Sequence, residues 1–202
     1  FEQSSSEESA ERKPMSGGSV LDLTCGLGVD TMALARRFER VVSLERDEAL
    51  AEVVRHNFAL MGITNVTVVS SSAEEYVASC NEHFDWIYAD PDRRTAEGRR
   101  VVRLEECSPN MIALWPTLQR ISGRVAIKNS PLFDVEEAFR LFPQSVVEVG
   151  SRTEHLKEYN KDIAKYVMMP GNAKRRHPVV EARTAALVAY AEETDLNYIT
   201  PG

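Results

Sequence analysis

Four polar side chains stand at or beside the carboxyl ends of strand-like apolar runs. They are Asp22, Glu45, Ser72 and Asp90. In open α/β folds this end of each strand faces the ligand, and carboxylate and hydroxyl oxygens accept hydrogen bonds there. We therefore expect the four side chains to line one binding site. The alternative is that they are ordinary polar residues at strand ends.

The first apolar run leads into a glycine turn. Residues 20–31 begin as a buried strand, break at Gly26 and Gly28, and resume as a helix. Such a turn lets a ligand approach the backbone, and the helix offers free N–H groups. Dinucleotide folds add a third glycine, but the chain has Thr31 there, and the carboxylate of Asp22 would repel a pyrophosphate. Because Asp22 would suit ammonium and sulfonium cations, the turn predicts S-adenosylmethionine as the cofactor.

The ends of the next two runs indicate that the ligand contains a nucleoside. Glu45 stands where nucleotide folds place an acid that accepts hydrogen bonds from ribose hydroxyls. The segment Ser71–Glu74 ends the third run, where an adenine edge would lie. A lone Gly-x-Gly is weak evidence, whereas the turn, Glu45, this segment and Asp90 together are specific.

The elements that must position these residues alternate along the chain. Apolar runs predict strands, and segments of helical spacing between them predict helices, which implies an α/β, doubly wound and mostly parallel sheet of about seven strands with helices on both faces. The predicted strands lie near 20–23, 40–45, 65–70, 84–90, 123–128, 145–149 and 184–190, and the predicted helices run from Asp30 to Phe38, from Asp47 to Gly62, from Ser72, over 109–121 and over 135–141. Residues 1–19 are expected to be an N-terminal segment and 20–202 one domain, with 151–182 unassigned.

The composition is that of a globular protein with an acidic balance. The 202 residues carry 24 basic and 31 acidic side chains, a net charge of −7, so a nucleic acid would have to be held by a local basic patch. No apolar run is long enough to cross a membrane and no signal peptide opens the chain, so we expect a cytoplasmic protein. The three cysteines and four histidines show no metal-ligand or disulfide spacing.

These motifs together resemble the class I S-adenosylmethionine-dependent methyltransferases, a resemblance that covers about residues 15–150. Residues 20–30 are similar to motif I of that class, Glu45 to its ribose acid, Ser71–Glu74 to its adenine region, and Asp90–Pro91 to its motif IV. Asp22–Leu–Thr–Cys–Gly–Leu–Gly28 most resembles RNA methyltransferases, among them cap trimethylguanosine synthases and uracil-C5 enzymes.

A bacterial group assigned as RNA methyltransferases, which carries a THUMP-like appendage, gives the best match. Its Asp-Pro-x-Arg-Arg and Glu-Gln-x-Ser-Ser-Glu segments resemble Asp90–Pro–Asp–Arg–Arg94 and Glu2–Gln–Ser–Ser–Ser–Glu7. The resemblance implies a Rossmann-like methyltransferase sheet and an N-terminal segment that folds over the cofactor. The predicted cofactor residues are Gln3, Asp22, Thr24, Gly26, Gly28, Asp30, Thr31, Glu45, Arg46, Ser72, Ala73 and Asp90.

The reacting end is predicted at Asp90, Pro91 and Arg93. Methyl transfer is an in-line displacement that needs alignment and no metal. In amino methyltransferases motif IV reads Asp/Asn-Pro-Pro-aromatic, whereas here Asp92 replaces the second proline and Arg93 the aromatic residue. A guanidinium can stack on a base, and Asp90 could accept amino hydrogens or act as a general base. A uracil-C5 reaction would need a cysteine nucleophile; Cys107 most simply begins a helix.

Basic side chains favour RNA as the substrate. An arginine-rich loop over 92–103 and the cluster Lys174–His177 suggest phosphate contacts, although a solvated face with internal ion pairs is the alternative. The predicted substrate-binding residues are Arg94, Arg99, Lys128 and Asn129. A small-molecule or protein methyltransferase, a non-catalytic cofactor- or RNA-binding module and, more distantly, a nicotinamide-dependent dehydrogenase are the competing functions, and the oligomeric state is left open.

Overall fold

The structure of the chain is a computed structural model that describes residues 15–93, 103–129, 134–143, 145–150, 164–169 and 197–199. These residues belong to two compact units, which lie within 1–122 and 123–202. The sequence predicts an N-terminal segment over 1–19 and one domain over 20–202, and this division of the chain stays a prediction. Among the described residues, none of the helices is both long and apolar enough to span a membrane.

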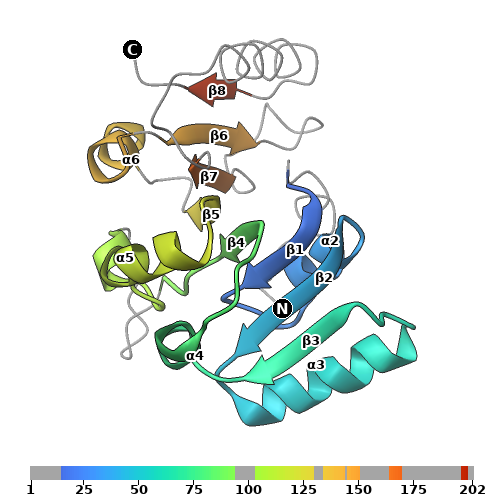
Figure 1. Cartoon of the computed structure of the whole chain (residues 1–202). Helices are drawn as coiled ribbons and strands as arrows, with labels where there is room; N and C mark the ends of the chain where they lie inside the picture. The colour runs from blue at the N-terminus through green and yellow to red at the C-terminus, as the bar shows by residue number, and fades with distance from the viewer. Residues whose placement is uncertain are drawn as a thin grey trace. The chain divides into compact units, whose positions relative to one another are not determined.

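The first unit is built on four strands that pair with one another in parallel. They are β1 (Gly17–Asp22), β2 (Phe38–Glu45), β3 (Val66–Ser70) and β4 (Trp86–Ala89), and they lie side by side in the order β3-β2-β1-β4 (Figure 1). Asp22 is in register with Ser43 and Tyr88, and Glu45 with Ser70. The register therefore brings the predicted acidic positions to one edge of the sheet.

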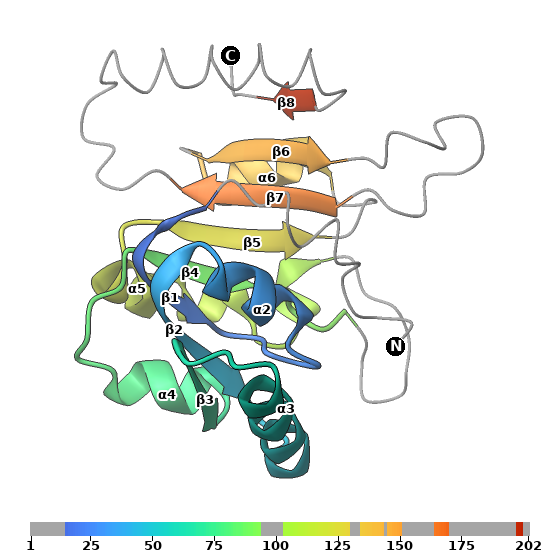
Figure 2. The ribbon, with the colours of Figure 1, turned by 90° about the vertical axis from the view of Figure 1, so that its right-hand side faces the viewer.

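Helices cover both faces of these strands, as the sequence predicts. They are α2 (Val29–Ala35), α3 (Glu48–Leu60), α4 (Ala73–Ser79) and α5 (Met111–Ile121), with a short 3-10 helix, η1 (Leu104–Glu106). Figure 2 shows α2 and α3 on one side of the strands and α4 on the other. This follows from right-handed crossovers, because the chain steps from β1 to β3 in one direction and then returns to β4.

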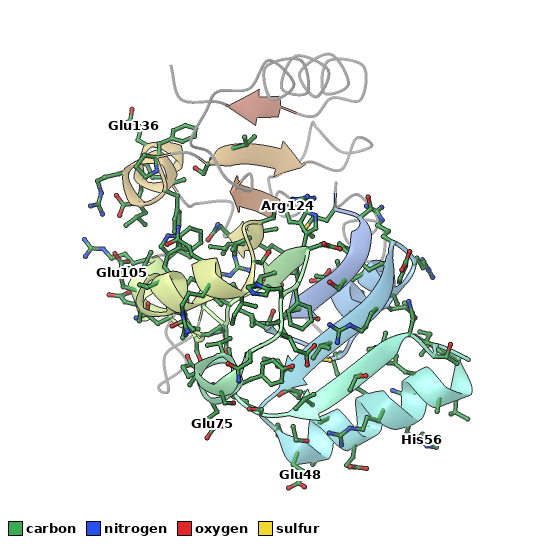
Figure 3. All side chains as sticks on the ribbon, in the orientation of Figure 1. Glu48, His56, Glu75, Glu105, Arg124 and Glu136 are labelled. Atoms are coloured by element: carbon green, nitrogen blue, oxygen red, sulfur yellow. The ribbon has the colours of Figure 1, made fainter. Side chains whose placement is uncertain are left out.

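The long helix α3 follows its sequence signals closely. Asp47 is its N-cap and accepts a hydrogen bond from the Leu50 N–H at 3.1 Å, and Gly62, with φ +70°, lies just beyond its end. Figure 3 shows Glu48 and His56 directed away from the strands, and both are exposed. The opposite face of α3 carries Val54 and Phe58 into a buried cluster.

The second unit departs from the predicted parallel arrangement. It contains β5 (Val125–Asn129), α6 (Val135–Leu141), β6 (Val146–Gly150), β7 (Ala164–Met169) and β8 (Asn197–Ile199), in the strand order β5-β7-β6-β8. Each of these three strand pairings is antiparallel. Apolar runs predict that a strand exists, but its direction depends on which neighbour it pairs with, so periodicity alone could not decide it.

Three local expectations changed or fall outside the described residues. The sequence predicts that the helix from Asp30 extends to Phe38, but α2 ends at Ala35 and Phe38 is the first residue of β2. Phe38 is buried, and an apolar residue at this position fits a helix and a strand equally well. β1 begins at Gly17, within the predicted N-terminal segment. β7 lies in the stretch left unassigned, while the strand predicted over 184–190 lies outside the described residues.

Candidate functional site: the carboxyl edge of the parallel strands

The two glycines of the turn after β1 are required for different reasons. Both have positive φ, +53° at Gly26 and +81° at Gly28. A Cβ at Gly28 would lie 2.7 Å from Cζ of Phe58 and 3.1 Å from Cγ1 of Val54, so this glycine lets α3 pack against the turn. A Cβ at Gly26 would meet no atom within 4 Å. Gly26 therefore presents its backbone to open space, as a ligand that approaches the main chain requires.

Asp22 organises the turn from beneath. Its Oδ2 accepts hydrogen bonds from Thr31 Oγ1 at 2.6 Å and Ser43 Oγ at 2.8 Å, and its Oδ1 accepts one from the Thr24 N–H at 3.0 Å. The side chain is 0% exposed, and burial raises its pKa, although these hydrogen bonds act in the opposite direction. In this structure Asp22 has no surface with which to reach a ligand. Its contacts give it a positioning role.

Thr24 joins the turn to the end of β4. Its Oγ1 accepts a hydrogen bond from the Asp90 N–H at 2.7 Å, while its own N–H donates to Asp22. The predicted reacting end is thus tied through one threonine to the buried carboxylate that holds the glycine turn. This link places the backbone of Asp90 beside the turn, as the sequence predicts.

Glu45 holds the turn from the end of β2. Its Oε2 accepts a hydrogen bond from the Gly26 N–H at 2.9 Å, and its Oε1 accepts one from the Asp47 N–H at 3.0 Å. A carboxylate has about four acceptor positions, so each oxygen of Glu45 keeps a further lone pair. The side chain is 9% exposed, at the edge of the buried region. These features fit a pair of ribose hydroxyls.

Ser72 and Ala73 begin α4 just past β3. Ser72 forms a capping box: its Oγ accepts from the Glu75 N–H at 3.2 Å, and its own N–H donates to Oε2 of Glu75 at 3.2 Å. Ala73 is buried. The hydroxyl of Ser72 is therefore engaged in capping. What this segment can offer an adenine ring is the space that the small side chains of Ser72 and Ala73 leave.

Arg46, next to Glu45, reaches the segment that follows β4. Its Nη1 donates to Oγ of Ser108 at 3.1 Å, and its Nη2 lies 4.0 Å from Oδ2 of Asp92. Asp92 and Ser108 also pair through their backbones, with N–O distances of 2.7 and 3.0 Å. The predicted motif IV region is thus linked at Asp92 both to Ser108, which follows η1, and to Arg46, which follows β2. Arg93 is half-buried beside this pairing.

Asp30, in the first turn of α2, is buried rather than facing solvent. The Tyr88 hydroxyl donates to its Oδ2 at 2.8 Å. Neither Tyr88 nor Ser43, the partner of Asp22, was among the predicted site residues. The signals were present, since each is a polar side chain inside an otherwise apolar strand run, but which carboxylate each would meet depends on strand register.

The remaining predicted residues belong to the second unit or lie outside the described residues. Lys128 and Asn129 are at the end of β5 in the second unit, and both are buried; the amide of Asn129 donates to the Ile127 carbonyl at 3.1 Å. Gln3, Arg94, Arg99 and the cluster Lys174–His177 are not among the described residues. Within the described part of the chain, histidine, cysteine, aspartate and glutamate side chains form no group of three that could hold a metal ion.

Solved structures with the same arrangement define the fold class. A protein from Porphyromonas gingivalis W83 that is assigned as a methyltransferase matches with a TM-score of 0.64 and 26% identity, over 83% of this chain and 41% of that chain. A Streptococcus mutans protein, also assigned as a methyltransferase and solved with S-adenosylhomocysteine, matches with a TM-score of 0.54 and 14% identity, over 81% and 94%. The chain therefore has the α/β fold of these proteins, which confirms the predicted fold class in its coarse form.

Sequence comparison adds relatives with stated activities. A family model described as "Conserved hypothetical protein 95" matches residues 7–105. The 23S rRNA (uracil(1939)-C(5))-methyltransferase of Klebsiella pneumoniae is 40% identical over 107 residues, 46% of this chain and 24% of the relative. The tRNA/tmRNA (uracil-C(5))-methyltransferase of Psychromonas ingrahamii is 41% identical over 140 residues, 59% and 38%. The chain thus spans less than two fifths of either relative's length.

Proposed function

We propose that the chain is an S-adenosylmethionine-dependent methyltransferase that acts on RNA by in-line methyl transfer. One observation carries the proposal: the Gly26 backbone is open on its outer side, and its N–H is held by the ribose-position carboxylate, Glu45. Sequence similarity to two RNA methyltransferases and a shared fold with a protein solved with S-adenosylhomocysteine support it.

The described residues fit such a cofactor. Glu45 would accept the ribose hydroxyls, the backbone at Gly26 would lie against the amino-acid part, and Ser72 with Ala73 would border the adenine. When bound, the cofactor supplies an electrophilic methyl group on a sulfonium. Asp22, through Thr31 and Thr24, would hold the turn in shape, with Asp30 bracing α2 through Tyr88.

The reacting end and the RNA contacts are the finer part of the proposal. Asp90, Pro91 and Arg93 would face the acceptor, because Thr24 ties Asp90 to the turn. The arginines at 94 and 99, with Lys128 and Asn129, would contact RNA. The THUMP-like appendage, the Asp-Pro-x-Arg-Arg motif IV and a cytoplasmic location belong to the same proposal and rest on sequence resemblance.

Calorimetry tests the cofactor assignment. We expect S-adenosylmethionine to bind and NAD not to bind, and we expect Glu45→Ala to weaken S-adenosylmethionine binding at least tenfold, which is about 1.4 kcal/mol. Glu48→Ala is the matched control, because Glu48 is exposed on α3 and directed away from the strands (Figure 3). Equal affinities for wild type and Glu45→Ala would show that the cofactor does not bind at this edge.

Transfer of labelled methyl groups tests the activity. The substrate is total RNA from a strain that lacks the gene, and we expect label in RNA that falls as salt rises and as Arg93 is replaced by alanine. Label in protein or small molecules instead of RNA would favour the second methyltransferase hypothesis. Cofactor binding with no transfer to any acceptor would favour a non-catalytic binding module.

A further inference from the structure

All three cysteines of the chain lie among the described residues; Cys25 and Cys107 are buried, and Cys80 is half-buried. Cys25 is buried in the cluster formed with Ala51, Val54, Phe58 and Val68 beneath the turn. Cys107 is 6% exposed and its Sγ donates to the Arg103 carbonyl at 3.2 Å. Cys80 follows α4, and its Sγ contacts the Glu82 carbonyl at 3.8 Å.

The two cysteines nearest the site are held as neutral thiols. Burial raises the pKa of Cys25 to about 12 and that of Cys107 to about 11, in the second case despite the positive charge of Arg93. At pH 7 a pKa of 11 corresponds to about one thiolate in ten thousand molecules. Cys80 follows the last turn of α4, a helix that begins at the carboxyl edge of β3 and runs away from the site.

A carbon acceptor such as uracil C5 needs a thiolate. C5 of uracil has no lone pair, so a thiolate must first add to C6 and place an electron pair on C5. C5 then attacks the methyl carbon and forms the C–CH3 bond, while the carbon–sulfur bond breaks and leaves its electron pair on sulfur. Loss of the C5 proton to a base finally expels the thiolate. The nucleophile in this sequence must be an exposed thiolate that can reach the face of the base.

An acceptor with its own lone pair needs none of these steps. Its lone pair attacks the methyl carbon, the carbon–sulfur bond breaks with its electron pair left on sulfur, and any proton on the acceptor leaves to a base or water. What the protein must supply is alignment and oxygen acceptors for the acceptor's hydrogens. The described edge supplies these: Thr24 fixes the backbone of Asp90 at 2.7 Å, beside the turn that Glu45 holds.

We propose that this site methylates a nitrogen or oxygen atom of an RNA nucleotide that carries its own lone pair, and not C5 of uracil, the position in the names of its relatives. This inference rests on the proposed function. It is carried by the positions of the cysteines within the fold and by the link between Thr24 and Asp90.

Two readouts on one reaction test the inference. Wild-type protein is incubated with S-adenosylmethionine carrying a labelled methyl group and with RNA whose uridines carry tritium at C5. Methylation at C5 must release tritium into water in proportion to methyl transfer, whereas methylation at nitrogen or oxygen releases none. We expect methyl label in RNA without tritium release, and nucleoside analysis that places the label on nitrogen or oxygen.

A covalent trap and cysteine variants complete the test. RNA with 5-fluorouridine cannot complete elimination at C5, so a C5 enzyme stays attached to it on a denaturing gel; we expect no attached protein. We also expect Cys107→Ala and Cys107→Ser to retain methyl transfer within about twofold, with Cys80→Ala as the control. Tritium release, a covalent adduct, or loss of transfer in both Cys107 variants with cofactor binding retained would overturn the inference.

A failure of the proposed function gives a different pattern. Cofactor binding with no methyl label in any RNA removes the proposed function and the inference with it. Methyl label at C5 keeps the function and removes only the inference.

Discussion

Replacing Asp22 by asparagine is expected to keep the turn folded and to remove a pH-dependent cost to stability. Asparagine has the same shape, and its Oδ1 can still accept from the Thr24 N–H. Its amide can donate to the hydroxyls of Thr31 and Ser43, which now donate to Asp22 but can also accept. We therefore expect the stability of Asp22→Asn to lie within about 1 kcal/mol of wild type at low pH.

Alanine at the same position is expected to cost much more. The hydroxyls of Thr31 and Ser43 lie 3.0 Å apart and can bond to each other, but the Thr24 N–H loses its acceptor. One unsatisfied donor costs about 1–3 kcal/mol, and the small cavity adds about 1 kcal/mol, so we expect a loss of about 2–4 kcal/mol.

The pH dependence has a defined sign. Burial raises the pKa of Asp22 above its ordinary value of 3.8, so the folded state binds this proton more tightly than the unfolded state. The stability that this provides is fully present below pH 3.8 and is lost as pH rises through the raised pKa, at about 1.4 kcal/mol per pH unit. The free energy of unfolding of Asp22→Asn should therefore rise relative to wild type over that interval.

Urea unfolding followed by circular dichroism, from pH 3.5 to 8, measures these differences. The informative quantity is the difference between variant and wild type at each pH, because other carboxylates titrate in both proteins. If Asp22→Asn is as unstable as Asp22→Ala at every pH, or if its difference from wild type falls with pH, the buried carboxylate is stabilised in its charged form and the reasoning is refuted.

Two further predictions concern the turn. Gly28→Ala should destabilise the fold by about 2–3 kcal/mol, because the new Cβ meets Phe58 at 2.7 Å and φ is positive. Gly26→Ala should cost about 1 kcal/mol of stability and mainly weaken S-adenosylmethionine binding. Thermal unfolding measures the first effect and calorimetry the second, and equal losses of stability in the two variants would contradict the assignment. Thr24→Val should remove the acceptor of the Asp90 N–H, speed hydrogen exchange at Asp90 and lower the methyl-transfer rate, while Thr24→Ser restores both. Unchanged exchange in Thr24→Val would show that this hydrogen bond does not hold Asp90.

Much of the first unit follows from local signals in the sequence. The helix starts at Ser72 and Asp47 and the helix end at Gly62 lie where the sequence predicts, and each depends on a short-range feature: a capping box, an N-cap and a glycine with positive φ. The helix over 135–141 was predicted with the same bounds. These elements depend on neighbours within a few residues, which is why the sequence can specify them.

The roles of the acidic residues were harder to predict from the sequence. Asp22 was expected to face a cationic ligand, but the structure buries it among Thr24, Thr31 and Ser43. Ser43 approaches Asp22 only because β2 pairs with β1 in one particular register. The sequence alone thus does not distinguish a strand-end carboxylate that faces a ligand from one that holds a ligand-binding turn in place.

The sequence by itself determined that a strand, a glycine turn and a helix follow one another near residue 26, and that acidic residues recur at strand ends. Those are properties of composition and spacing along the chain. Only the tertiary structure decided that Gly26 faces open space while Gly28 contacts Phe58, that Glu45 holds the Gly26 N–H, and that the strands of the second unit pair antiparallel. Each of these depends on segments distant in the chain meeting in one register, and such contacts leave no periodic signal in the sequence.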